Sequence, residues 1–282
     1  MDIYYAVGSG LGHANRARLF IEKLQLSNIL VIVNSQYAKK LLEPIPHKII
    51  PISCFSKLET ARHEAQKIIG QHKPEKVYLD TFPGGIVGEW CGIGAETIHF
   101  YLVSRILKVE IYKKILPDLR LPTFKKIFIS EKISDAQYQY LKCISVENSL
   151  IDISLTHGLT SKNKATQIRL DIQQPFWLII HSGNIEECLT LYQHALDLAK
   201  LHNKIVEICF VHPQPKSLSR YVEGKVFQDW HLKDFVVQAE KIFTACGYNL
   251  MHELKEFRDK QVFIPFFRKY DDQFLRAKYF RA

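Results

Sequence analysis

The residue best suited to chemistry is a histidine at the end of a glycine-rich run near the N-terminus. The run follows the apolar residues 3–7 and reads Gly8-Ser9-Gly10-Leu11-Gly12-His13. Glycines let the backbone turn tightly and approach a ligand, and an imidazole titrates near neutral pH, so it can take a proton from a hydroxyl group. We therefore predict that His13 is a general base. The loop around it, with Gly10, Gly12 and Arg16, would bind a phosphate or a hydroxyl acceptor. Two alternatives stay open, because His13 could only bridge backbone groups and Arg16 could pair with a surface carboxylate.

A second set of candidate residues surrounds a glycine near the C-terminus. Residues 241–244 predict a strand, and Gly247 then precedes a helix expected to extend through Glu256. The backbone at a glycine can approach a diphosphate closely, and the start of a helix favours anions. Asn249 and Glu253 stand four residues apart, so both project from one face of that helix. The alternative for Glu253 is an ordinary exposed helix carboxylate.

The N-terminal loop is not a dinucleotide fingerprint. Its spacing is G-x-G-x-G, and His13 stands at the position where that fingerprint has its third glycine. The second predicted strand ends at Asn34 and Ser35, without the acidic residue that would hold a ribose 2′-hydroxyl. We therefore exclude NAD-type binding on this loop.

The elements that must position these loops alternate between strand and helix. In the first half, helical stretches over 15–26 and 57–71 are interspersed with apolar strands over 3–7, 29–34, 48–52, 76–80, 98–103 and 126–130. Strands separated by helix-length segments predict right-handed βαβ crossovers and a parallel sheet with helices on both faces. Ligands of such sheets bind at the carboxyl ends of the strands, where the glycine-rich loop lies.

The same alternation resumes in the second half, after a polar stretch. We predict strands over 176–181, 205–211, 241–244 and 262–265, helices over 185–201 and from Asp272, and short elements at 226–230 and 235–240. The fold class is therefore α/β, with two doubly wound, Rossmann-like domains facing a cleft. The domains would be 1–150 and 175–282, joined by a linker over 151–174.

Three stretches of the sequence resemble the GT-B glycosyltransferases. The N-terminal run through Arg16 is similar to the histidine-terminated acceptor loop of bacterial and archaeal nucleotide-sugar transferases, and residues 80–89, D-T-F-P-G-G-I-V-G-E, resemble a segment after their fourth strand. Residues 245–253, A-C-G-Y-N-L-M-H-E, are similar to the H-C-G-W-N-S-x-x-E core of the plant-type donor motif. The sequence departs from that motif at Ala245, where the family has a phosphate-contacting histidine, and at Leu250, where it has serine. We also expect the second domain to be short at its C-terminus.

The resemblance implies that a nucleotide-diphosphate sugar, most commonly a UDP-sugar, binds the second domain. Its contacts would be Ser182, Gly183, Gly247, Tyr248, Asn249, Glu253, Asp272 and Gln273. Glu253 would hold the ribose hydroxyls, and Asp272 and Gln273 the sugar hydroxyls; the alternative for this pair is helix capping and a solvated side chain. His13 would activate a hydroxyl acceptor carried by a lipid or a polysaccharide. The sequence has no D-x-D motif to ligate a metal, so we expect a metal-independent, inverting transferase without a cofactor.

Two other functions would use the same residues. A nucleotide-sugar hydrolase of the same architecture, similar to the pseudaminic-acid pathway enzyme, would use His13 to activate water, and residues 10–16 resemble its G-x-G-H-x-x-R motif. A protein that binds a nucleotide-sugar without turnover would be consistent with Ala245. Release of free sugar without an acceptor would favour the hydrolase.

The composition limits the partners of the protein. The formal net charge is +9, and part of the excess lies between Lys108 and Lys126. A basic surface attracts phosphate groups, but the sequence shows no zinc module, helix-turn-helix or aromatic RNA platform, so we do not expect nucleic-acid binding. Peripheral contact with an anionic membrane fits the charge better, and solvated lysines are the plain alternative.

Cysteine usage and hydropathy indicate the compartment. The six cysteines lie far apart and form no C-x-x-C pair, so we expect small buried side chains in a reducing compartment rather than disulfides or metal ligands. No apolar run reaches the roughly 18 residues that a membrane span needs. The N-terminal residues lead straight into an apolar strand. We therefore predict a cytoplasmic protein, with peripheral contact at the inner face of the membrane.

Overall fold

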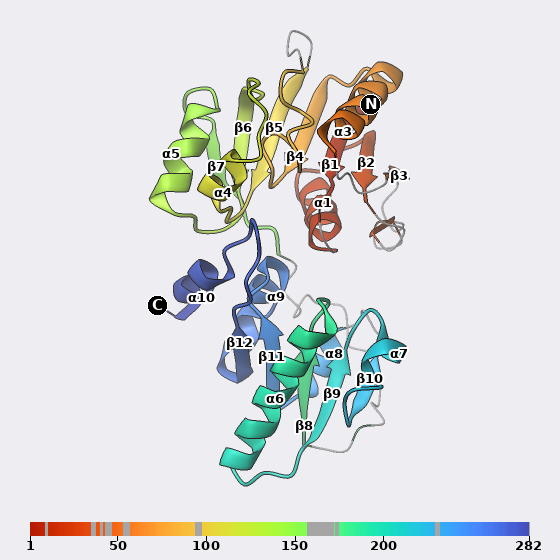
Figure 1. Cartoon of the computed structure of the whole chain (residues 1–282), viewed down its shortest axis with the longest axis vertical. Helices are drawn as coiled ribbons and strands as arrows, with labels where there is room; N and C mark the ends of the chain where they lie inside the picture. The colour runs from red at the N-terminus through yellow and green to blue at the C-terminus, as the bar shows by residue number, and fades with distance from the viewer. Residues whose placement is uncertain are drawn as a thin grey trace. The chain divides into compact units, whose positions relative to one another are not determined.

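The computed structural model consists of two compact units (Figure 1). It describes residues 1–8, 11–34, 38–39, 42, 47–52, 57–93, 98–156, 172, 175–228 and 232–281. The first unit comprises Met1–Leu155 and Arg268–Asp272, and the second comprises Thr156–Phe267 and Gln273–Ala282. The segment Arg268–Asp272 therefore groups with the first unit, although the sequence placed it in the second half. Most of the predicted linker, 151–174, lies outside the described residues.

The first unit is built on a parallel sheet of seven strands in the order β3-β2-β1-β4-β5-β6-β7. The strands are β1 (Asp2–Ala6), β2 (Ile29–Val33), β3 (Lys48–Pro51), β4 (Lys76–Asp80), β5 (His99–Ser104), β6 (Phe124–Ile129) and β7 (Leu150–Asp152). The strand order reverses between β1 and β4, whose register pairs Tyr4 with Tyr78. In a doubly wound sheet the loops after two such strands border the crevice that binds ligands.

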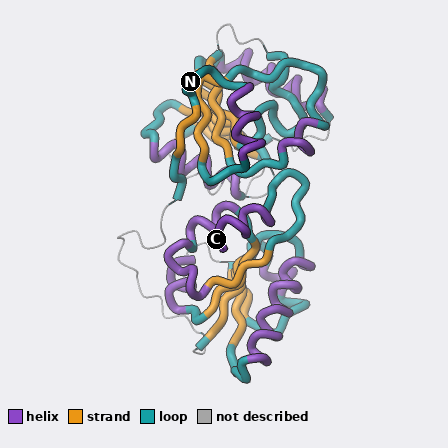
Figure 2. Tube along the Cα trace, turned by 90° about the vertical axis from the view of Figure 1, so that its left-hand side faces the viewer, coloured by secondary structure: helices purple, strands orange, loops and turns teal. Residues whose placement is uncertain are grey.

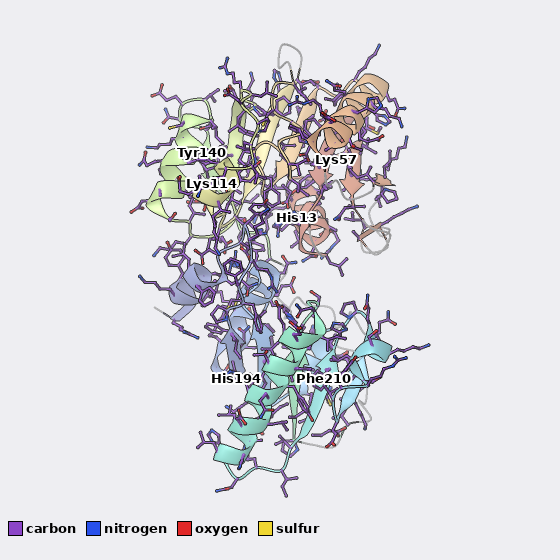
Figure 3. The ribbon with its side chains drawn as sticks, in the orientation of Figure 1. His13, Lys57, Lys114, Tyr140, His194 and Phe210 are labelled. Atoms are coloured by element: carbon purple, nitrogen blue, oxygen red, sulfur yellow. The ribbon has the colours of Figure 1, made fainter. Side chains whose placement is uncertain are left out.

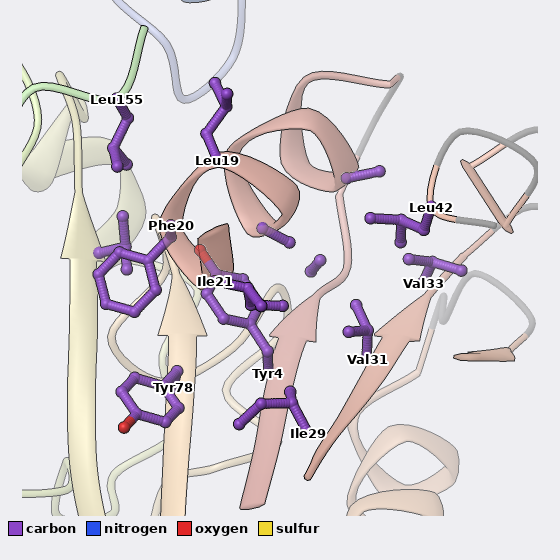
Figure 4. Close-up of a cluster of buried hydrophobic side chains, with 14 of the residues drawn as sticks. Tyr4, Leu19, Phe20, Ile21, Ile29, Val31, Val33, Leu42, Tyr78 and Leu155 are labelled. Carbon is purple, nitrogen blue, oxygen red and sulfur yellow. The ribbon is translucent and has the colours of Figure 1, made fainter. Parts of the chain in front are cut away.

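Helices cover the first sheet, so its strands are apolar on both faces, as parallel sheets require (Figure 2). The helices are α1 (Gly12–Lys23), α3 (Leu58–His72), α4 (Val109–Lys113) and α5 (Asp135–Cys143). On one face, Phe20 of α1 packs against Tyr4, Tyr78 and Phe128 (Figure 4). On the other face the alternate strand residues form a second core with helix α3. Two buried faces hold β1 and β4 in place beneath the candidate site.

The second unit repeats the pattern with five parallel strands in the order β10-β9-β8-β11-β12. The strands are β8 (Phe176–Ile180), β9 (Glu207–Val211), β10 (Lys225–Phe227), β11 (Lys241–Ala245) and β12 (Gln261–Ile264). The helices are α6 (Ile185–Leu201), α7 (Pro215–Leu218), α8 (Leu232–Gln238), α9 (Tyr248–Glu253), the 3₁₀ turn η1 (Lys255–Lys260) and α10 (Gln273–Arg281). Here the order reverses between β8 and β11, so the loops after these strands border the crevice.

The structure corrects several element boundaries. Helix α1 begins at Gly12 rather than near Asn15. The capping residue, Leu11, makes no side-chain hydrogen bond, so no capping residue in the sequence marks this start. The helix after Gly247 ends at Glu253 and continues only as the 3₁₀ turn η1. Residues 232–238 form a helix. The elements α4, β7 and α7 are three to five residues long, too short to show a period in the sequence.

Two further findings concern hydropathy and cysteines. Within the described residues, no helix is both long enough and apolar enough to cross a bilayer. Cys91, Cys188, Cys209 and Cys246 are buried, as expected. Cys143 is exposed, so the prediction of uniformly buried cysteines is wrong at this position. It is the last residue of α5, where the exposed side of the helix leaves no core to join.

Candidate functional site

At the carboxyl ends of β1 and β4, His13 lies against an aspartate (His13 is labelled in Figure 3). Nδ1 of His13 lies 2.5 Å from Oδ2 of Asp80, the last residue of β4. His13 is 3% exposed and Asp80 is 2% exposed. His13 stands in the first turn of α1, so the helix and the neighbouring strand fix both partners of this pair.

Arg16 completes the arrangement from the next turn of α1. Its Nε atom donates to Oδ1 of Asp80 at 3.0 Å and its Nη2 atom to Oδ2 at 2.6 Å. This two-pronged pairing is the geometry in which a guanidinium binds a carboxylate most strongly. Nη2 also donates to the hydroxyl of Thr81 at 3.1 Å, and the hydroxyl of Tyr4 donates to Asp80 at 3.3 Å. Arg16 therefore pairs with a carboxylate, but this carboxylate is buried rather than at the surface, where the alternative prediction had placed it.

The surroundings fix the protonation of the pair. Burial lowers the pKa of His13 to about 4, although the nearby Asp80 carboxylate favours the charged ring. Burial alone would raise the pKa of Asp80, but Arg16 and His13 hold that pKa well below its ordinary value. At neutral pH the imidazole is therefore neutral and the carboxylate is charged. Since an ionised carboxylate only accepts, the ring proton sits on Nδ1 and the lone pair on Nε2.

Nε2 of His13 points at the backbone of Gly8. A Cβ placed on Gly8 would lie 2.0 Å from Nε2, so only glycine leaves room for the ring here. The ring also stacks on Phe82, with 5.9 Å between centroids. The backbone of Gly8 thus borders the basic nitrogen.

The loop after β4 is held by an internal carboxylate. Glu89 is fully buried and accepts hydrogen bonds from the hydroxyl of Tyr5 at 2.8 Å and from the backbone N–H groups of Ile86 and Val87. Its head lies under Gly85, where φ is +86° and a Cβ would collide with the carboxylate. The D-T-F-P-G-G-I-V-G-E segment is therefore a turn held by internal hydrogen bonds, which presents Thr81 to Arg16 and Phe82 to His13.

Thr81 itself has an unusual backbone. Its φ is +71°, in the left-handed region that β-branched residues rarely adopt. It is 1% exposed, and its hydroxyl contacts both Arg16 and Asp80. Strain of this kind persists where the surrounding structure holds it, and such residues gather at functional sites.

The second unit presents another histidine–carboxylate pair, at the end of β8. Nε2 of His181 lies 2.7 Å from Oε2 of Glu187, and a Cβ on Gly183 would collide with both side chains. His212, at the end of β9, accepts from the N–H of Gln214 through Nδ1, so its Nε2 carries the proton and donates to the carbonyl of Gly183 at 3.3 Å. These bonds fix the turn that contains Ser182 and Gly183.

The start of α6 beside this turn is already satisfied. The side chain of Asn184 accepts from the N–H of Glu187 at 2.9 Å, and Glu186 and Glu187 place two carboxylates in the first turn. Negative side chains at this position already complement the helix dipole. They would repel an incoming diphosphate, so an anion is better accommodated on the other side of the crevice.

That other side is the turn after β11. Gly247 has φ −69°, a value open to any residue, and a Cβ added there would meet no atom within 4 Å. Beneath the turn, the fully buried Arg276 donates to the carbonyl of Cys246 at 2.9 Å. Oδ1 of Asn249 is buried and has no hydrogen-bond partner in the part of the chain that the structure describes. An open space, a nearby cation and an unused acceptor therefore meet at this turn.

Comparison of the whole fold with solved structures places the two units in a known architecture. The UDP-GlcNAc 2-epimerase of Neisseria meningitidis bound to UDP-GlcNAc matches with a TM-score of 0.64 and 12% identity, over 95% of this chain and 84% of that chain. The spinosyn rhamnosyltransferase SpnG complexed with thymidine diphosphate matches with 0.60 and 12%, over 95% and 81%. MurG of Acinetobacter baumannii matches with 0.52 and 14%, over 99% and 82%. The chain has the GT-B fold. No family model and no curated protein matches the sequence.

The GT-B architecture confirms the predicted fold class of two Rossmann-like domains with parallel sheets. At these sheet edges the structure brings together the predicted residues in two groups. In the first unit, Gly12, His13 and Arg16 gather at the end of β1, while Gly10 lies outside the described residues. In the second, Ser182 and Gly183 border the crevice on one side, and Gly247, Tyr248 and Asn249 on the other.

Three residues predicted to contact the donor, Glu253, Asp272 and Gln273, lie outside these two groups. Glu253 is half-buried at the end of α9. Gln273 is 4% exposed, and its Oε1 accepts from the backbone N–H of Phe266 at 3.0 Å. Asp272 is half-buried in the segment that groups with the first unit. The oxygen of Gln273 is thus engaged with the backbone, and its amide nitrogen takes no part in that bond.

Sequence reasoning did not assign roles to Asp80, Thr81, Glu187 or Arg276. Asp80 ends a buried apolar strand, and an acid at that position was the signal that could have marked it. Arg276 gave no such signal, because its burial depends on the packing of α10 against Cys246 and Met251. Within the described residues, no three histidine, cysteine, aspartate or glutamate side chains are grouped to hold a metal ion.

Proposed function

We propose that the protein is a glycosyltransferase that moves a sugar from a nucleotide-diphosphate donor to a hydroxyl acceptor, with His13 as the general base. The observation that carries this proposal is the pairing of a neutral, buried imidazole with Asp80. Asp80 would hold the ring in one tautomer and stabilise the imidazolium that forms when Nε2 takes the acceptor proton, as the carboxylate does in a catalytic triad. Direct attack by the activated hydroxyl would invert the sugar carbon.

The donor is assigned to the second unit. A diphosphate at the turn after β11 would occupy the open space at Gly247, near the cation of Arg276 and away from Glu186 and Glu187. Oδ1 of Asn249 would accept from the nucleotide or the sugar, which would satisfy a buried atom that is otherwise costly. Tyr248, Ser182 and Gly183 would line the same crevice. Stabilisation of the departing diphosphate by these groups would not require a metal.

The ribose and sugar contacts follow from the same placement. Glu253, on the same helix as Asn249, would accept the ribose hydroxyls, and Asp272 with Gln273 would contact the sugar. Two of the similar structures are bound to UDP-GlcNAc and thymidine diphosphate. A nucleoside diphosphate sugar, with UDP-sugars first, is therefore the donor class that we propose, and the acceptor hydroxyl would belong to a lipid or a polysaccharide in the cytoplasm.

The second candidate is a nucleotide-sugar hydrolase. His13 is almost completely buried, and water is the smallest nucleophile that could reach Nε2. Nε2 would then take a proton from water, whose oxygen would bond to the sugar carbon as the bond to the nucleoside diphosphate breaks. The two candidates differ only in the molecule that occupies the space near Gly8.

The test begins with binding, because a ligand that binds only the folded protein raises its apparent stability. The melting temperature is measured with UDP, thymidine diphosphate and their sugars, for the wild type and for Glu253→Ala. We expect a shift with at least one nucleotide and a smaller shift in the variant. Glu256→Ala, at an exposed position nearby, is the control and should behave as the wild type.

Product analysis then separates the reactions. With the donor that binds, a transferase yields product only with an acceptor, a hydrolase yields free sugar alone, and an epimerase yields an altered nucleotide-sugar. His13→Ala should abolish transfer but leave the nucleotide-induced shift intact, since His13 lies in the other unit. Undiminished transfer by His13→Ala would refute the assignment of the base.

A further inference from the structure

The second unit carries two phenylalanines whose rings face solvent. Phe267 is 73% exposed and Phe274 is 54% exposed. The residues immediately before them are joined by the hydrogen bond from the N–H of Phe266 to Oε1 of Gln273, so the two rings belong to one region of the surface. Single exposed apolar side chains are common, but a pair of aromatic rings at one place indicates a contact surface.

Helix α10 presents cations beside these rings. Phe274, Lys278 and Arg281 are exposed and stand at positions i, i+4 and i+7, so they share one face of the helix. The opposite face is buried through Arg276 and Ala277. The exposed face therefore combines an aromatic residue with two cations and no carboxylate.

The approach to the helix is also basic. Residues 266–270 read F-F-R-K-Y, and Lys269 is exposed. Of the two carboxylates that follow, that of Asp271 is paired with Arg105 and that of Asp272 is half-buried. From 273 to 281 the sequence contains no acidic residue. Positive charge therefore accompanies the exposed aromatic ring of α10.

We propose that Phe267 and Phe274, with Lys278 and Arg281, form a docking surface for an anionic lipid bilayer. Aromatic rings insert at the boundary of headgroups and acyl chains, and lysine and arginine bind anionic headgroups around them. The surface goes beyond the proposed transfer reaction and does not depend on it.

The test is flotation of the full chain with vesicles of phosphatidylcholine alone and of phosphatidylcholine with phosphatidylglycerol. We expect binding only to the anionic vesicles. Each cation near the surface contributes about fivefold to partitioning, so Lys278→Glu/Arg281→Glu should lower the partition coefficient at least tenfold. Phe267→Ser/Phe274→Ser should lower the partition coefficient as strongly, even at low salt, where attraction between the cations and the headgroups is least screened.

Two matched double variants control for non-specific effects. Leu201→Ser/Ile205→Ser removes apolar side chains that are 76% and 100% exposed, and Lys200→Glu/Lys216→Glu reverses two exposed charges elsewhere in the same unit. Both should bind as the wild type does. Absence of binding to anionic vesicles, equal losses in the control variants, or binding that survives the phenylalanine substitutions would each overturn the proposal. Unchanged melting temperatures exclude unfolding as the cause, and nucleotide-induced shifts report the donor site separately.

Discussion

The Nδ1 atom of His13 lies 2.5 Å from Oδ2 of Asp80, and Arg16 binds the same carboxylate through two hydrogen bonds. Helix α1 provides His13 and Arg16, and strand β4 provides Asp80. The three side chains meet where the strand order of the first sheet reverses. A buried carboxylate shared in this way both neutralises the arginine and orients the imidazole. The two duties can be separated by experiment.

Replacing Asp80 with asparagine tests the orienting role. The amide would donate to Nδ1, which favours the tautomer with the proton on Nε2 and so removes the base. We expect Asp80→Asn to lower kcat by about 10³–10⁴-fold, the loss seen when a triad carboxylate is replaced in this way. The variant should also be destabilised by about 3–5 kcal/mol, because the buried Arg16 loses its counterion.

The control for that variant is Asp152→Asn, at an exposed position of β7. It should leave turnover and stability unchanged. Activity is measured at a temperature where circular dichroism shows Asp80→Asn to be folded. Full activity in folded Asp80→Asn would show that the carboxylate is only structural.

The second prediction concerns pH. The pKa of His13 falls from 6.5 in the unfolded chain to about 4 in the folded protein, so between these values the unfolded state binds more protons. Stability is then complete above pH 6.5 and falls as the pH drops towards 4, by about 3 kcal/mol from this group. The lowered pKa of Asp80 removes further stability only below its ordinary range.

Urea unfolding at pH 7 and pH 5 measures this effect. The loss of stability between the two should be smaller in His13→Gln than in the wild type. His194→Gln, at an exposed position of α6, should match the wild type. For turnover, a neutral base predicts kcat/KM that does not fall at pH 6.5 but only on approaching pH 4. Parallel pH profiles of stability in the wild type and His13→Gln would contradict the lowered pKa.

The sequence predicted the architecture well because it depends on repeated signals. The apolar strands and the long helix α6 each show a pattern of apolar residues that can be recognised without knowing their tertiary contacts. Helix α6 was predicted at its observed bounds, Ile185–Leu201. His13 was found because its loop is unusual in composition. Its partner was not assigned, because the contact between His13 and Asp80 joins residues 67 apart in the chain.

The donor side shows a different limit. The turn at Gly247 was visible as a motif, but the distribution of charge around the crevice was not. Only the pairing of β8 with β11 sets Gly183, with Glu186 and Glu187, on one side and Gly247 on the other. Gln273 likewise read as a ligand residue, whereas its oxygen caps the backbone of Phe266. Polar side chains in motifs do not reveal which of their atoms are already used.

The third prediction concerns the strained backbone at Thr81. Its hydroxyl accepts from Arg16 and donates to Asp80 in a buried site, so Thr81→Val, which keeps the shape and the strain, leaves Arg16 short of an acceptor. We expect a loss of about 1–3 kcal/mol in the free energy of unfolding. Thr81→Ser keeps the hydroxyl and removes the branch that strains a φ of +71°, and should be close to the wild type. Equal stability of the two variants would show that the hydroxyl bonds contribute little.

The last prediction separates binding from folding at the donor turn. Gly247 has an ordinary φ of −69° and open space where a Cβ would stand, so Gly247→Ala should change the ligand-free melting temperature by only a few degrees in either direction. The added methyl group would fill the space proposed for the diphosphate, and the melting-temperature shift caused by nucleotide should largely disappear.

The matched control is Gly70→Ala. Gly70 lies in α3 of the other unit and also has no atom within 4 Å of an added Cβ. Alanine there should stabilise the helix by about 0.5–1 kcal/mol and leave the nucleotide-induced shift unchanged. Should Gly247→Ala keep the full shift, the diphosphate cannot rest on this turn. Because a Cβ at Gly247 meets no atom of the protein within 4 Å, loss of the nucleotide-induced shift would indicate weaker ligand binding rather than unfolding.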